Sequence, residues 1–267
     1  VVNIWKQEPA GSDNSLMSAL QRNQALKTLV LDETPWVMDA DNEADQKRML
    51  TTFFDESAMD YRLASQLKDL KDLQNSDGSW SWWRGMRGSA SITAQVLQTL
   101  AGLNVMAGYQ KATAKMIENG MDYLRTVVMK EFEEMKRMEK KGQKPMICDY
   151  HAIQYLYINT LLGKNPFYDS DYVELKNYLL KYLEADRHRD IYSKALMAVV
   201  LNGDGKAKKA KEYVESIRQY TVTKPGMGTY FDTWHAGYSW FDYRIPTQTA
   251  AIEALKAVDP ADTETIN

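Results

Sequence analysis

The chain contains 267 residues, of which 44% are hydrophobic and 26% are charged, a composition typical of a soluble globular protein. Its net charge of −3 provides no broad basic surface, so nucleic acid is not an expected partner. No apolar run approaches the roughly 18 residues of a membrane helix, and the single cysteine, Cys148, excludes an internal disulfide and a cysteine-based zinc site. The first residues lack the basic and apolar segments of a signal peptide.

Apolar residues recur at helical spacing through most of the chain. Residues 1–30 predict an N-terminal arm and a first helix, and residues 31–267 predict one larger helical domain, interpreted as part of a longer protein. The periodicity is clearest between Asp55 and Leu73. Further helices are expected near 42–54, 91–103, 113–141, 149–162, 171–185, 190–201, 206–220 and 247–258. Since no stretch alternates as a strand does, the sequence predicts an all-α fold of successive antiparallel helical hairpins.

The segment Gln74–Arg84 separates two predicted helices and holds three tryptophans within four positions. Asn75 to Gly78 is rich in residues that favour turns, and Gly78 can adopt a positive φ. A second segment, Gly237–Arg244, repeats the order of glycine, aromatic residues and arginine before a helix that opens with threonine and glutamine. Both segments are interpreted as corners that reverse the chain between helical hairpins.

The spacing Gln74-x-x-x-Gly78-x-Trp80 resembles the Q-x-x-x-G-x-W repeat of α/α toroids. Terpenoid cyclases share that fold with the thioester domain of α2-macroglobulins and complement proteins. From about Leu31 to Val258 the chain resembles the large α2-macroglobulin-like proteins of Gram-negative bacteria. The segments that carry this second resemblance are Glu33–Ala40, Glu43–Gln46, Gln154–Tyr157 and Pro246–Thr249.

The resemblance implies an α/α toroid, either a complete or an incomplete ring, in a periplasmic or cell-envelope endopeptidase inhibitor that traps proteases. The expected partners are proteases, bound by the full-length protein, and the neighbouring domains of the same chain. Thioester-bearing relatives join a cysteine to a glutamine three residues later, but His151 stands at that distance from Cys148. Thioester chemistry is therefore excluded, and the domain is expected to serve as a scaffold without a cofactor.

Other residues with chemical potential have simpler interpretations. The acidic run Asp39–Asp45 lacks the glycine and glutamate of a calcium loop and is typical of a capped helix start. Cys148 and His151 stand three residues apart, which predicts a shared helix face. A buried thiol beside a histidine is favoured over a nucleophile pair, because a free cysteine is commonly buried. His188 and His235 are isolated, so neither a zinc site nor another metal site is expected.

A charged run and a group of aromatic residues also stand out. The charged run Glu131–Lys141 is expected to be a solvated helix end. Aromatic residues near the two corners either plug one end of the ring, which is favoured, or line a binding surface such as a sugar cleft. These residues are Trp80, Trp82, Trp83, Trp234, His235, Tyr238, Trp240 and Tyr243.

The alternative function is a terpenoid-cyclase-like or glycan-cleaving enzyme that uses carboxylates such as Asp41, Asp232 or Asp242. No complete catalytic constellation is evident, so an enzyme is not the favoured interpretation. A structural spacer is a third option.

Overall fold

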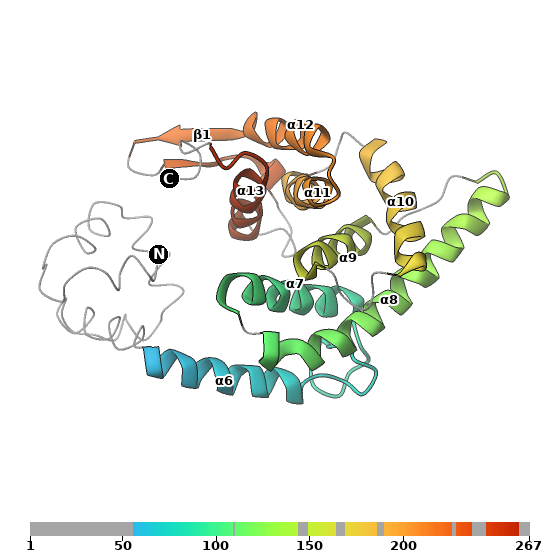
Figure 1. Cartoon of the computed structure of the whole chain (residues 1–267), viewed down its shortest axis with the longest axis vertical. Coiled ribbons are helices and arrows are strands. Elements are labelled where there is room, and N and C mark those ends of the chain that lie inside the picture. Colours follow the sequence, from blue (N-terminus) through green and yellow to red (C-terminus); the bar gives the residue numbers. More distant parts are fainter. Residues whose placement is uncertain are drawn as a thin grey trace, which may run out of the picture. The chain divides into compact units, whose positions relative to one another are not determined.

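The computed structural model describes residues 56–108, 110–143, 149–163, 169–185, 190–225, 228–236 and 244–261. Over these ranges the fold is all-α, as predicted (Figure 1). Its helices are α6 (Glu56–Asp72), α7 (Ala90–Ala107), α8 (Gln110–Lys140), α9 (Asp149–Leu162), α10 (Ser170–Ala185), α11 (Ile191–Gly203), α12 (Ala207–Arg218), the 3₁₀-helix η1 (Trp234–Ala236) and α13 (Arg244–Val258).

The chain divides into two compact units, with a boundary between Asp69 and Leu70 that falls within α6. Residues 224–227 are assigned to the first unit, and the second comprises 70–223 and 228–267. Apart from Lys224 at the end of β1, the features described below belong to the second unit. The predicted elements before residue 55, including the boundary at residue 30 and the acidic run, lie outside the described residues.

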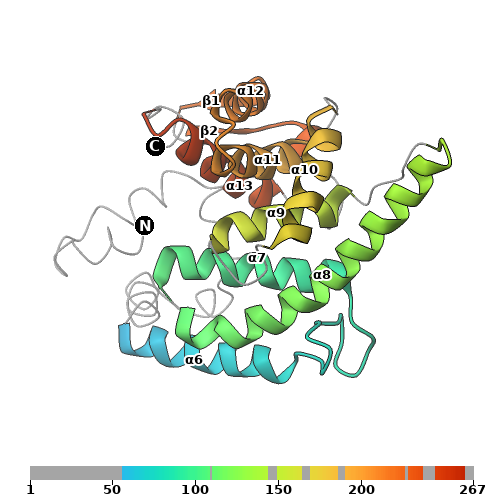
Figure 2. The ribbon, with the colours of Figure 1, turned by 45° about the vertical axis from the view of Figure 1, so that its right-hand side comes forward.

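The helices of the second unit alternate between two layers. Helices α7, α9, α11 and α13 contact one another in that order and are called the inner series (Figures 1 and 2). Helix α8 packs on α7 and α9, α10 packs on α9, and α12 packs on α11 and α13. Consecutive helices therefore form hairpins whose first members lie side by side.

Burial explains which helices occupy which layer. Every residue of α11 from Ile191 to Leu201 is buried, and α9 is buried continuously from Ala152 to Asn159. Helix α12 buries only one face, which carries Ala210, Tyr213, Val214 and Ile217. A helix that is apolar on all sides belongs in an interior, whereas an amphipathic helix covers it.

The expectation that no strand occurs was wrong. Strands β1 (Thr221–Lys224) and β2 (Gly228–Phe231) pair in a two-stranded sheet directly after α12. The hydroxyl groups of Thr223 and Thr229 form a hydrogen bond of 3.0 Å across the strands. Four residues per strand are too few for alternation to be recognised in the sequence, although β-branched residues favour the extended conformation.

Helix α13 begins at Arg244, three residues before the predicted start at Thr247. The predicted helix begins after Pro246. In the structure Pro246 occupies the first helical turn, where a missing backbone N–H costs little. Helix α8 likewise begins at Gln110, before the predicted start at Thr113.

Candidate functional site

The segment that follows α6 forms a rigid corner held by Gln74, Gly78 and Trp80. The Gln74 side-chain amide donates hydrogen bonds to the carbonyl oxygens of Gly78, at 2.9 Å, and of Met116 in α8, at 3.0 Å. Gly78 has a φ of 85°, and a Cβ atom there would lie 2.1 Å from the Asn119 carbonyl oxygen. All three residues of the glutamine–glycine–tryptophan spacing therefore have an identifiable structural role.

Trp80 connects this corner to the start of α7. Its side chain is 2% exposed, and its Nε1 donates a hydrogen bond of 2.9 Å to the Leu70 carbonyl oxygen. Its backbone N–H donates to the Thr93 hydroxyl at 2.9 Å, and its carbonyl oxygen accepts from the Ser89 N–H at 2.8 Å. Ser89 also caps α7. The corner thus fixes the first turn of α7.

The other two tryptophans of this segment are not buried with Trp80. Trp82 is 43% exposed, Trp83 is 69% exposed, and their ring centroids are 6.3 Å apart. Met86 is 51% exposed, and Arg84 and Arg87 are also exposed. The segment Ser81–Arg87, here called the aromatic loop, therefore presents apolar and cationic side chains together.

Less of the second aromatic group is described. Trp234 and His235 lie in η1, where the half-buried His235 ring is 5.0 Å from the Tyr220 ring. Tyr238, Trp240 and Tyr243 lie outside the described residues, as do Asp41 and Asp242. Asp232 is exposed, directly after β2.

A connected set of polar side chains, here called the polar seam, crosses the inner series. The Gln98 amide of α7 donates to the Tyr192 hydroxyl of α11 at 2.9 Å and accepts from the Gln154 amide of α9 at 3.2 Å. The Tyr192 ring stacks on Tyr150 at 6.3 Å. Gln154 is fully buried, and its Oε1 accepts no hydrogen bond from a described residue. An unsatisfied buried acceptor is rare, because it costs free energy.

A separate polar contact joins α9 to α13 through Tyr157. Its hydroxyl donates a hydrogen bond of 2.5 Å to the Glu253 carboxylate. Burial raises the pKa of the Tyr157 hydroxyl well above its ordinary value, and the hydrogen bond to Glu253 raises this pKa further. Tyr157 therefore remains a neutral donor at any physiological pH.

At one end of the seam, three helices bring Ser91, His151 and Glu131 together. The Ser91 hydroxyl lies 2.9 Å from His151 Nε2, and His151 Nδ1 lies 3.7 Å from a Glu131 carboxylate oxygen. The sequence had paired His151 with Cys148, which lies outside the described residues. Ser91 is 60 positions from His151, so no short motif could have indicated this contact.

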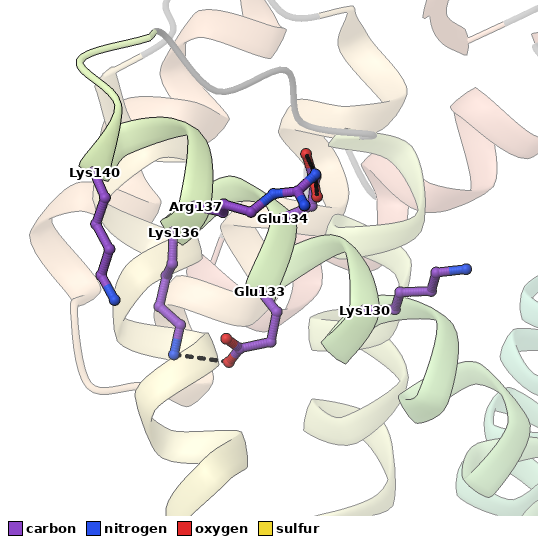
Figure 3. Close-up of a pocket in the computed structure, with 6 residues that line it drawn as sticks. All are labelled: Lys130, Glu133, Glu134, Lys136, Arg137 and Lys140. Atoms are coloured by element: carbon purple, nitrogen blue, oxygen red, sulfur yellow. Dashed lines mark hydrogen bonds and ion pairs between the residues drawn. The ribbon is translucent and has the colours of Figure 1, made fainter.

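The charged end of α8 borders a shallow hollow of about 520 Å³ (Figure 3). Lys136 pairs with Glu133 at 2.8 Å, Arg137 pairs with Glu134, and Lys130 points away from these carboxylates. Neighbouring opposite charges largely neutralise one another, and exposed pairs contribute little. The hollow has the mixed charge expected of a solvated helix end.

Within the described ranges, no group of three or more His, Cys, Asp or Glu residues could hold a metal ion. No described helix is long and apolar enough to cross a membrane.

Comparison with known proteins does not identify a family, because no family model and no curated protein matches the chain.

Proposed function

We propose that this chain is an α/α-toroid domain of a bacterial α2-macroglobulin-like protease trap, in which it acts as a scaffold that docks on other domains. The observation that carries the proposal is the corner built by Gln74, Gly78 and Trp80, which holds the exposed aromatic loop. The order of contacts within the inner series is also what a ring of hairpins requires. The family named in the proposal comes from the resemblance of the sequence motifs.

The aromatic loop suits docking for physical reasons. Trp82, Trp83 and Met86 offer polarisable apolar surface, and tryptophan, methionine and arginine are enriched at protein interfaces. The loop is anchored at Trp80, so little conformational entropy is lost when it binds. Arg84 and Arg87 favour an acidic rim on the surface that receives the loop.

The test uses the full-length protein that contains this chain, mixed with several proteases of different specificity. We expect cleavage to produce a compact form on native gels and to protect large protein substrates from the captured protease. The double variant W82S/W83S should reduce this protection at least fivefold. V105S/M106S is a matched control, because Val105 and Met106 are 62% and 82% exposed at the other end of α7.

The outcomes separate the two parts of the proposal. If wild-type protein neither changes form nor protects substrates with any protease, the trap function is refuted. If both double variants behave like wild type, the trap stands but the aromatic loop has no docking role. If the part of the full-length protein that precedes this chain contains neither a lipoprotein signal nor β-domains, that result would also argue against this family.

An enzyme that uses Asp232 has less support. A glycosidase or cyclase needs a carboxyl group in a recessed cavity with a second carboxylate nearby. Asp232 is exposed and follows a surface hairpin. The D232N variant should therefore leave any glycan-cleaving or cyclising activity of the protein unchanged.

A further inference from the structure

We infer that Ser91, His151 and Glu131 form an acyl-transfer site that hydrolyses carboxylic esters through an acyl-serine intermediate. The site goes beyond the scaffold function proposed above and is independent of it. Its three side chains come from α7, α9 and α8, and they meet at the end of the polar seam.

The geometry accommodates the tautomer that catalysis needs. Nδ1 of His151 faces the Glu131 carboxylate at 3.7 Å, so a proton on Nδ1 is electrostatically favoured there. Nε2 is then unprotonated and accepts the hydrogen bond from the Ser91 hydroxyl, at 2.9 Å. In the opposite tautomer, a lone pair on Nδ1 would face the carboxylate. Ser91 is therefore the donor and His151 is the base.

The 3.7 Å separation exceeds a normal hydrogen bond. Catalytic hydrogen bonds are often long in free enzymes and shorten when the substrate is bound. Glu131 is a positioning residue, because it acts through His151 and does not touch the substrate. Its carboxylate stabilises the imidazolium that forms when His151 takes the serine proton.

Burial and helix geometry also suit the reaction. The His151 side chain is 15% exposed and that of Glu131 is 33% exposed, while Ser91 is half-buried. Ser91 is the second residue of α7, where the positive end of the helix dipole stabilises the oxyanion of a tetrahedral intermediate.

The steps balance without a cofactor. The Ser91 oxygen attacks the ester carbonyl carbon while its proton moves to His151 Nε2. The C–O bond to the alcohol breaks, and the leaving alkoxide takes that proton. Water then attacks the acyl-serine, losing a proton to Nε2, and the carboxylic acid leaves as the proton returns to Ser91. The net reaction is ester plus water to acid plus alcohol.

The first experiment treats wild-type protein with an alkyl fluorophosphonate and locates the adduct by peptide mass spectrometry. We expect Ser91 to be labelled in folded protein and not in heat-denatured protein. S91A should abolish labelling and p-nitrophenyl acetate turnover, and H151Q should reduce both at least 100-fold. S216A is the matched control, because Ser216 is also half-buried and hydrogen-bonded, and folded S216A protein should be labelled at Ser91 at the wild-type rate.

The pH dependence tests Glu131 separately. The labelling rate of wild-type protein should rise with pH along a single limb in the histidine range, about pH 6–7. E131Q removes a charge that favours the imidazolium. The rise of labelling rate with pH should therefore occur at lower pH in E131Q, while the maximal rate falls about tenfold.

Some results would overturn the site. Wild-type protein that gains no adduct at Ser91 under millimolar probe refutes it without any variant, even if S91A fails to fold. Labelling that persists in folded H151Q would show that the serine is not activated by the histidine. A melting temperature lowered by S91A, with no labelling of wild type, would mean that the contact only joins α7 to α9.

Discussion

Replacing Gly78 by alanine tests the corner directly, because two separable costs meet at that position. Its φ of 85° lies in the left-handed region, where a side chain is disfavoured. The new Cβ would also lie 2.1 Å from the carbonyl oxygen of Asn119 and 2.6 Å from its carbonyl carbon. Both are backbone atoms of α8, so relief requires the corner to move away from that helix.

Gly85 provides a matched control for the first cost. Its φ is 83°, yet a Cβ placed there has no described atom within 4 Å. In G85A the left-handed conformation costs about 1–2 kcal/mol. The lower conformational entropy of the unfolded chain with alanine offsets about 0.4–1 kcal/mol of this cost. G78A carries the same two contributions and adds overpacking of about 1–3 kcal/mol. Loss of the Gln74 hydrogen bonds, which span the same contact, would add to this.

Urea unfolding followed by far-UV circular dichroism measures the difference. We expect G85A to lose about 1 kcal/mol and G78A to lose about 1–3 kcal/mol more, with similar denaturant slopes. Equal midpoints for the two variants would refute the reasoning, because the close approach of Gly78 to α8 would then carry no energetic weight.

Three other substitutions, W80F, G120A and Y157F, test further contacts of the second unit. W80F removes the donor to the Leu70 carbonyl and some buried volume, so it should cost about 1–3 kcal/mol in urea unfolding, whereas W83F at an exposed site should be neutral. G120A places a Cβ 2.8 Å from Trp80 Cζ3 and 2.9 Å from Leu97 Cδ2, and it should cost about 1–3 kcal/mol. The control G102A, with no described atom within 4 Å, should gain up to about 1 kcal/mol; stabilisation by both would contradict the packing. The pKa of Tyr157 is raised in the folded state, so its stabilising contribution is present below about pH 10 and is lost as the pH rises further. Above pH 10 the unfolding free energy should therefore fall by up to about 1.4 kcal/mol per pH unit because of Tyr157, and Y157F should remove this part of the fall. An unchanged slope of unfolding free energy between pH 10 and 11 would show that this tyrosine does not titrate differently on folding.

Local signals in the sequence predicted the features that depend on local geometry. Helical periodicity indicated α6 to α13 to within a few residues, and the spacing of Gln74, Gly78 and Trp80 indicated the turn. The sequence does not distinguish the three neighbouring tryptophans of this segment, yet only Trp80 is buried. Composition does not reveal which indole faces α8, because that depends on how the helices pack.

The seam, its serine–histidine end and the contact of Tyr157 with Glu253 could not be predicted for a related reason. Gln98 and Tyr192 lie 94 positions apart, and Tyr157 and Glu253 lie 96 apart. These pairs meet only because alternate helices become neighbours in the inner series. A single sequence contains no spacing rule for such contacts, whereas an i,i+3 pair such as Cys148 and His151 is easy to notice and easy to overvalue.

The corner and the proposed ester site share the first turn of α7, which gives them a common structural logic. Ser89 and Thr93 are both tied to Trp80, through hydrogen bonds of 2.8 and 2.9 Å. Ser91 lies midway between them in sequence and contacts His151. A helix whose first turn is held on both sides of one residue has little freedom to rotate, so the Ser91 hydroxyl is kept at a fixed distance from His151 before any substrate arrives. Preorganisation of that kind is what a nucleophile and its base require. The same corner therefore supports both the loop proposed to dock and the half-buried Ser91.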